Sequence, residues 1–126
     1  MLIQNPNEEA VDVVVTFMRP GGVTQTEEYT IAGSSRFTIN VNAIVTESDV
    51  STRVEGNLPI ICERAMYWND RGGGHDSIGV VNPSTVWYLA EGPTAWDFET
   101  YVLVQNPNLE PAQVTFTFMK PGGVIQ

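Results

Sequence analysis

Residues 2–25 read LIQNPNEEAVDVVVTFMRPGGVTQ, and residues 103–126 read LVQNPNLEPAQVTFTFMKPGGVIQ. The two segments lie 103 − 2 = 101 residues apart and are identical at 15 of 24 positions without a gap. A period of about 100 residues is typical of tandem domains, each with its own core, and is too long for a solenoid of short units. We therefore predict that residues 1–85 form most of one repeat, lacking its first strand, and that residues 86–126 begin the next.

The repeated segment alternates apolar and polar side chains with the period of a β-strand. Val13, Val15 and Phe17 form one apolar row in the first copy, and Val114, Phe116 and Phe118 form the same row in the second. A period of two with one apolar face predicts a half-buried strand. Similar patterns predict further strands near residues 29–31, 37–41, 50–54, 60–68, 78–81, 86–90 and 98–104.

Turn signals separate these predicted strands at residues 5–7, 19–22, 33–35, 55–57 and 71–74, which are rich in Gly, Pro, Asn and Ser. No stretch of ten or more residues has a helical period. Short strands at roughly ten-residue spacing predict an all-β fold, an immunoglobulin-like antiparallel β-sandwich that is cut out of frame with the tandem repeat. The only cysteine is Cys62, so the cysteine pair of antibody domains is absent and the likeness is architectural.

The same alternation predicts which side chains form the core. The residues expected in one sandwich core are Val13, Val15, Phe17, Ile31, Phe37, Ile39 and Val41. The residues expected to point outward are Thr16, Thr38 and Asn40. This assignment depends on register, because a slip of one residue would invert a whole strand.

Composition excludes several classes of partner. Six basic against fifteen acidic residues give a net charge of −9, which disfavours contact with nucleic-acid phosphates or an anionic membrane surface. No apolar run approaches the roughly 18 residues of a membrane helix, so we expect no membrane insertion. Residues 1–6 have neither a basic start nor a long apolar stretch and predict no signal peptide.

Several longer strings resemble a known repeat. WYLAEG at Trp87–Gly92 and FETYVLVQNPN at Phe98–Asn108 resemble the opening of a repeat of about 100 residues, immunoglobulin-like and functionally uncharacterised, that occurs in tandem in large secreted bacterial cell-surface proteins. Residues 35–42, 50–54, 59–68 and 73–79 resemble its middle and end, so the resemblance covers essentially the whole chain. It implies an extracellular or cell-surface repeat with no established enzymatic activity.

The residues that could support catalysis are few. His75-Asp76-Ser77 has the letters of a hydrolase triad, but consecutive side chains diverge, so we expect a polar turn instead. Gly72–Gly74 lacks the Lys and Ser or Thr that complete a phosphate-binding loop. Cys62 has no nearby His and is expected to pack as a small apolar side chain.

A loop site for a hard cation is a further possibility. Asp70, His75, Asp76 and Asp97 are all expected in loops that could meet at one end of the sandwich. Calcium needs several oxygen ligands, and no spaced acidic motif supports such a site. We therefore predict no metal, no cofactor and no enzymatic activity.

Charged and aromatic residues have two interpretations each. Glu63 and Arg64 point to opposite faces of one predicted strand, and we expect a structural ion pair or hydrogen bonds from Arg64 to loop carbonyls rather than a ligand site. The aromatic residues outside the core pattern are Trp68, Trp87, Trp96, Tyr67, Tyr88 and Tyr101. They either seal core ends and domain junctions or form a sugar-stacking platform.

The duplicated hairpin leads to a functional hypothesis. Residues 26–85 supply the remaining strands only once, so one copy of the hairpin lacks partners. The residues then expected to form the packing surface between repeats or subunits are Val114, Phe116, Phe118, Trp87 and Leu89. We predict a structural module of an extracellular surface stalk, fibre or filament, joined head to tail with copies of itself or adjacent repeats. The alternative is an adhesive or carbohydrate-binding module that binds surface glycans through exposed Trp and Tyr.

Overall fold

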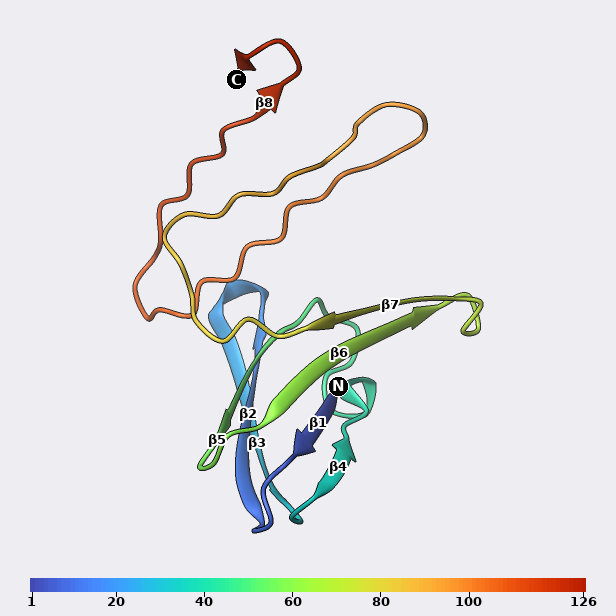
Figure 1. The fold of residues 1–126 in the computed structure, drawn as a ribbon, viewed down its shortest axis with the longest axis vertical. Helices are drawn as coiled ribbons and strands as arrows, with labels where there is room; N and C mark the ends of the chain where they lie inside the picture. Colours follow the sequence, from blue (N-terminus) through green and yellow to red (C-terminus); the bar gives the residue numbers. More distant parts are fainter. The chain divides into compact units, whose positions relative to one another are not determined.

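The computed structural model describes residues 1–126, with the side chain of Val124 excepted. The chain divides into two compact units, Met1–Thr85 (unit 1) and Val86–Gln126 (unit 2). Unit 1 holds strands β1 to β7 and two short 3-10 helices, and unit 2 holds a two-stranded ribbon, β8 and β9 (Figure 1). No described helix is both long enough and apolar enough to cross a membrane.

Unit 1 consists of two antiparallel sheets. The strands of the four-stranded sheet, in the order β4-β1-β6-β7, are Ser35–Thr38, Leu2–Asn5, Ile61–Trp68 and Gly73–Ile78. The strands of the three-stranded sheet, in the order β3-β2-β5, are Val23–Ile31, Val11–Arg19 and Ser51–Gly56. The 3-10 helices are η1 (Pro20–Gly22) and η2 (Val41–Ala43). The all-β fold predicted from the alternation is therefore confirmed.

The core of unit 1 is built on the central strand β2. Val11, Val13, Val15 and Phe17 of β2 are at most 1% exposed, because a pleated strand turns every second side chain to the same face. They pack with Ile3 of β1 and with Ile31, Ile39 and Val45. The predicted burial of Val13, Val15, Phe17, Ile31 and Ile39 is confirmed, Val41 is partly buried against the core, and Thr38 and Asn40 are exposed as predicted. Thr16 is half-buried.

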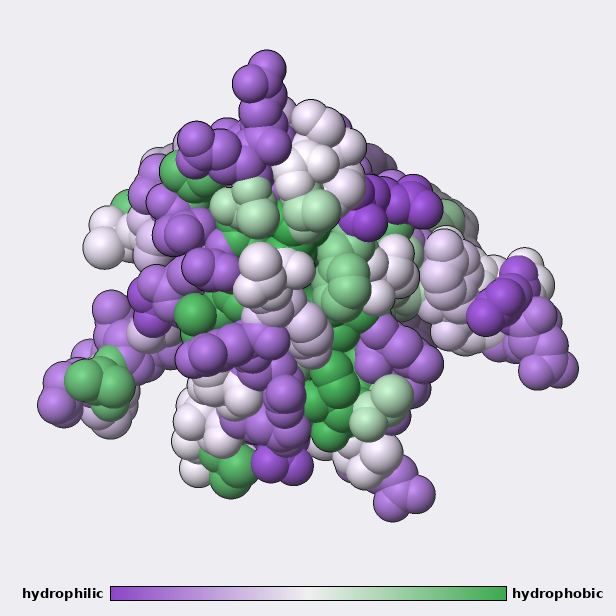
Figure 2. Space-filling view, turned by 90° about the horizontal axis from the view of Figure 1, so that it is seen from below, coloured by the Kyte–Doolittle hydropathy of each residue, from purple (hydrophilic) through white to green (hydrophobic). Residues whose placement is uncertain are grey.

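Phe37 is not a core residue, and that prediction is wrong. Its side chain is 36% exposed and lies against Tyr29, with the ring centroids 5.2 Å apart and the planes tilted by 47°. Phe37 belongs to β4 and Tyr29 to β3, which are edge strands of the two sheets. The aromatic pair therefore lies where the sandwich is open, and one side of Phe37 stays in water. Figure 2 shows hydrophobic surface among hydrophilic side chains on one face of the molecule.

The seventh strand lies earlier in the sequence than predicted. Residues 71–74 were expected to form a turn and residues 78–81 a strand, whereas β7 spans Gly73–Ile78 and pairs with β6 from Trp68 to Glu63. The turn falls at Asn69–Gly72, where the Gly72 N–H donates to the Asn69 carbonyl at 2.7 Å. A Cβ at Gly73 would collide with the Trp68 indole, so glycine permits this close cross-strand approach.

In unit 2 only the tight turn of the repeat forms regular strands. Gly122 and Gly123 adopt φ values of 83° and 78°, close to those of Gly21 and Gly22, and β8 (Met119–Lys120) pairs with β9 (Val124–Ile125). Residues 86–90 and 98–104, predicted as strands, form none. A strand needs a hydrogen-bonded neighbour, and an isolated hairpin is marginal in water. The turn is local, whereas the strands require partners.

Replacing Phe17 should cost far more stability than replacing its counterpart Phe118. Phe17 is fully buried and Phe118 is 55% exposed, although both occupy the same position of the repeat. We expect Phe17→Ala to lower the free energy of unfolding by about 3–5 kcal/mol and Phe118→Ala to change it by less than about 0.5 kcal/mol. Urea unfolding of dilute protein measures both, and equal losses would contradict the assignment of the core to unit 1.

Candidate functional site

A buried asparagine at the end of β1 connects the β1–β2 loop with the β3–β4 turn of unit 1. The Asn5 side chain is fully buried, and its Nδ2 donates to the carbonyls of Glu9 at 2.8 Å and of Ile31 and Ala32 at 3.1 Å. Its Oδ1 accepts from the Asn7 backbone N–H at 3.0 Å and from Asn7 Nδ2 at 2.7 Å. Both the NH2 group and the carbonyl oxygen of this buried amide are hydrogen-bonded, so the amide holds the loops in place without leaving a buried polar group unpaired.

Asn7 extends this network to a further loop. Its Nδ2 also donates to the Pro59 carbonyl at 2.9 Å, which joins the β1–β2 turn to the loop before β6. The sequence of Asn5-Pro6-Asn7 by itself predicts only a turn. The signal that could have indicated more is the retention of this string, as Asn106-Pro107-Asn108, in the second copy.

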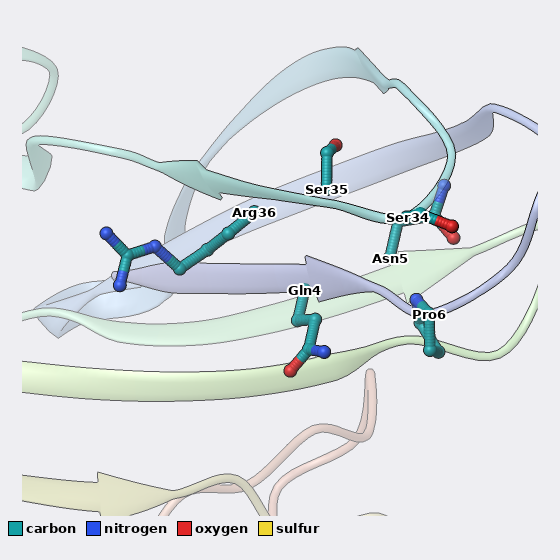
Figure 3. Close-up of a pocket in the computed structure, with 6 residues that line it drawn as sticks. All are labelled: Gln4, Asn5, Pro6, Ser34, Ser35 and Arg36. Atoms are coloured by element: carbon teal, nitrogen blue, oxygen red, sulfur yellow. The ribbon is translucent and has the colours of Figure 1, made fainter.

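A hollow of about 520 Å³ lies beside this network (Figure 3). It is lined by Gln4, Asn5, Pro6, Ser34, Ser35 and Arg36, from β1, β4 and the turn before β4. Gln4 and Arg36 are cross-strand partners, and Ser34 has a φ of 50° in that turn. The Ser35 hydroxyl donates to the Ala32 carbonyl at 2.6 Å. The hollow offers the Arg36 guanidinium and the Gln4 amide to a polar ligand, and its hydroxyls have no base beside them.

A second hollow, of about 270 Å³, crosses the face of β1, β6 and β7. It is lined by Leu2, Glu63, Ala65, Tyr67, Gly74, His75 and Asp76. His75-Asp76-Ser77 lies within β7, so the predicted polar turn is wrong. Adjacent side chains on a strand point to opposite faces, so Asp76 projects from the face opposite to His75 and Ser77 and the three cannot line up as a triad. The carboxylates and the phenol ring of this hollow could contact a sugar.

The loop residues considered as a possible cation site do not come together in the structure. Among the described residues, no three His, Cys, Asp or Glu side chains come close enough together to hold a metal ion. His75 and Asp76 are in β7 rather than in a loop, and Asp70 is in the β6–β7 turn. Asp97 belongs to unit 2.

Cys62 packs against the core, as predicted. Burial raises the pKa of its thiol, the positive Met1 amino group lowers it in part, and Glu63 raises it further. Because the thiolate is the nucleophilic form, this environment holds the cysteine in its less reactive state. Desolvation by burial also lowers the pKa of the Met1 amino group, which donates to the Ile39 carbonyl at 2.8 Å.

The prediction of an ion pair or loop hydrogen bonds for Arg64 is wrong. Glu63 and Arg64 are both exposed, and the structure gives Arg64 no charged partner or hydrogen bond among the described side chains. The ion pair described in the chain joins Arg53 to Glu55 on β5 at 2.6 Å. Arg64 reaches water because β1 pairs with β6 only as far as Glu63.

The residues predicted to pack between repeats are all exposed in this chain. The exposed set includes Val114, Phe116, Phe118, Trp87 and Leu89. The rings of Phe116 and Phe118 are nearly parallel, with centroids 6.4 Å apart and planes at 11°. The corresponding side chains of unit 1, Val15 and Phe17, are fully buried. The same apolar row is therefore covered in one unit and open in the other.

The aromatic residues outside the core are exposed as well. None of Trp68, Trp87, Trp96, Tyr67, Tyr88 and Tyr101 is less than half exposed, so within the described chain they do not seal the end of a core. Tyr67 and Trp68 are consecutive on β6 and project from opposite faces, so these two do not form one flat platform. A role at junctions between repeats stays a prediction.

Comparisons with protein-family models, with curated proteins and with solved structures found no match for this chain. The interpretation of its surfaces therefore rests on the residues themselves.

Replacing Asn5 should destabilise unit 1, while the same change at Asn106 should not. Asn106 Nδ2 donates to the Glu110 carbonyl at 2.9 Å and its Oδ1 accepts from Asn108, but these exposed bonds connect to no other loop. Asn5→Ala leaves buried carbonyls without donors, so we expect a loss of about 2–4 kcal/mol. Asn106→Ala should change the free energy of unfolding by less than about 0.5 kcal/mol. Thermal and urea unfolding measure both, and similar losses would show that the Asn5 network is not structural.

Proposed function

We propose that this chain is a structural module of an extracellular surface stalk, fibre or filament, in which immunoglobulin-like repeats join head to tail. The observation that supports this proposal is the repeated segment in its two environments. In unit 1 its apolar row is buried under partner strands, and in unit 2 the same row is exposed to water. The apolar row that partner strands cover in unit 1 has no such strands over it in unit 2. Strands of the kind found in unit 1 would therefore fit the exposed row of unit 2.

The energy of that exposed row favours association. Burying each large apolar side chain contributes about 1.5–3 kcal/mol. For Val114, Phe116 and Phe118 together this is roughly 5–9 kcal/mol, which is comparable to the stability of a small domain. A contact between unit 2 of one copy and a different surface of the next is heterologous, so it need not close into a ring and can propagate.

The strand pairing supports the immunoglobulin-like part of the proposal. β1 pairs with β4, and β2 lies between β3 and β5. In immunoglobulin variable-type sandwiches strand B likewise pairs with E, and strand C lies between F and C′. β6 departs from that pattern, because it pairs with β1 where strand A would lie. The extracellular part of the proposal is supported by the resemblance of residues 87–108 to repeats of secreted surface proteins.

Self-association should depend on the apolar row of unit 2. We expect the full chain to gain average mass with concentration in sedimentation equilibrium, and the double variant Phe116→Asn, Phe118→Asn to remain monomeric. The matched control is Thr115→Asn with Thr117→Asn. These residues alternate with the apolar row and project from the other face of the segment, so this variant should associate like the unmodified chain. If all three proteins stay monomeric at high concentration, the head-to-tail proposal is wrong.

The second candidate is a carbohydrate-binding module, favoured by the hollow on β1, β6 and β7. Tyr67 lines it together with the Glu63 and Asp76 carboxylates. An aromatic ring can pack on the apolar face of a sugar while carboxylates accept its hydroxyl hydrogens. If this function is correct, calorimetric titration with a panel of oligosaccharides should show binding that Tyr67→Ala abolishes. Trp68→Ala, on the other face, should leave that binding intact.

A further inference from the structure

Strand β6 has a free edge along half of its length. β7 pairs with β6 from Glu63 to Trp68, whereas β1 covers the other side only from Ile61 to Glu63. On the β1 side, residues 65–68 therefore have no neighbouring strand. An open edge presents unpaired backbone N–H and C=O groups and can accept an added strand. The four residues Ala65-Met66-Tyr67-Trp68 include no proline and no charge that would discourage such pairing.

The repeat itself contains a segment with the register to fill this edge. An offset of 101 matches Leu2 with Leu103, and Leu2 pairs with Glu63. In an antiparallel pair each step back along one strand is a step forward along the other. Extending the ladder therefore places Tyr101, Thr100, Glu99 and Phe98 opposite Ala65, Met66, Tyr67 and Trp68, in that order.

The side chains of the two segments match in this register. Ile3 and Cys62, which are paired, both contact the core of unit 1. The two-residue period then places Thr100 beside Met66 and Phe98 beside Trp68 on the core side of the sheet. Met66, Trp68 and Phe98 are each more than 40% exposed in the single chain. An aromatic cross-strand pair would remove apolar surface from water on both sides.

The segment is accessible in unit 2. After the turn at Ala95–Phe98, Figure 1 shows the chain running on in an extended course, drawn in orange. The Thr100 hydroxyl donates to the Pro93 carbonyl at 2.6 Å, which holds the segment beside residues 92–93.

We propose that the free edge of β6 at Ala65–Trp68 binds Phe98–Tyr101 of a second copy of this chain as an added antiparallel strand. This inference rests on the proposed function and deepens it, because it names the edge, the segment and the register of the head-to-tail contact. Each copy offers the edge in unit 1 and the segment in unit 2. Every copy can thus act as acceptor and donor at once, and the contact repeats along a fibre.

Disulfide trapping between two separately prepared variants tests the partner and the register. In a Cys62→Ser background, Met66→Cys protein is mixed with Thr100→Cys protein and oxidised mildly. Opposite residues of an antiparallel pair lie within the Cα separation that a disulfide requires. We expect a covalent heterodimer linked between positions 66 and 100, identified by mass spectrometry. The matched control mixes Met66→Cys with Glu99→Cys, whose side chain points to the other face, and should cross-link several times more slowly.

Each alternative result is informative. Equal cross-linking of positions 99 and 100 would overturn the register, and an absent cross-link in chains that still associate would overturn this inference while the proposed function stands. One chain carrying both Met66→Cys and Thr100→Cys should form covalent oligomers. A cross-linked monomer would instead show that the segment folds onto its own β6.

A second variant tests the same contact without any introduced cysteine. Thr100→Pro lies in unit 2, outside the core of unit 1, and removes a backbone N–H from the added strand. We expect it to weaken association at least tenfold in sedimentation equilibrium. Unchanged association would contradict strand addition at this edge.

Discussion

The fully buried carboxamide of Asn5 is the interaction on which the arrangement of unit 1 depends. Its donors reach the carbonyls of Glu9, Ile31 and Ala32, and its acceptor is bonded to Asn7. These bonds hold the end of β1 against the turn that leads into β4. Ile3, two residues earlier on the same strand, is thereby positioned on the core. Since a buried amide is costly when unpaired, any shift of β1 along its neighbours would break several bonds together.

Comparing the two copies of the repeat shows which features form from local sequence and which need tertiary contacts. Asn106 and Asn108 already form the bonds of the Asn-Pro-Asn turn, and the Pro-Gly-Gly turn closes in both copies. What unit 2 lacks are the distant carbonyls and the neighbouring strands. The local turns are therefore encoded within about ten residues, whereas long strands and a buried apolar row need partners from elsewhere in a repeat.

Open strand edges and uncovered apolar rows connect the fold with the proposed function. A sandwich with one free edge on β6 and an exposed row in unit 2 has two different surfaces that favour association. Fifteen acidic residues against six basic ones give the chain a net charge that keeps proteins soluble, so association would have to occur through specific surfaces rather than general aggregation. This combination suits a module that assembles in line with others.

The sequence by itself determined the strand period of Val13, Val15 and Phe17, the Asn-Pro-Asn and Pro-Gly-Gly turns, and the recurrence of one segment after 101 residues. These are properties of neighbouring residues, or of one segment compared with another. The tertiary structure alone decided that Phe37 lies at an open edge, that β7 begins at Gly73 and that Arg64 reaches water. It also decided that residues 86–104 form no strands. The physical reason is that hydrogen bonding between strands and burial of side chains depend on which distant segment lies alongside. The alternation of residues within one segment does not identify that neighbouring segment.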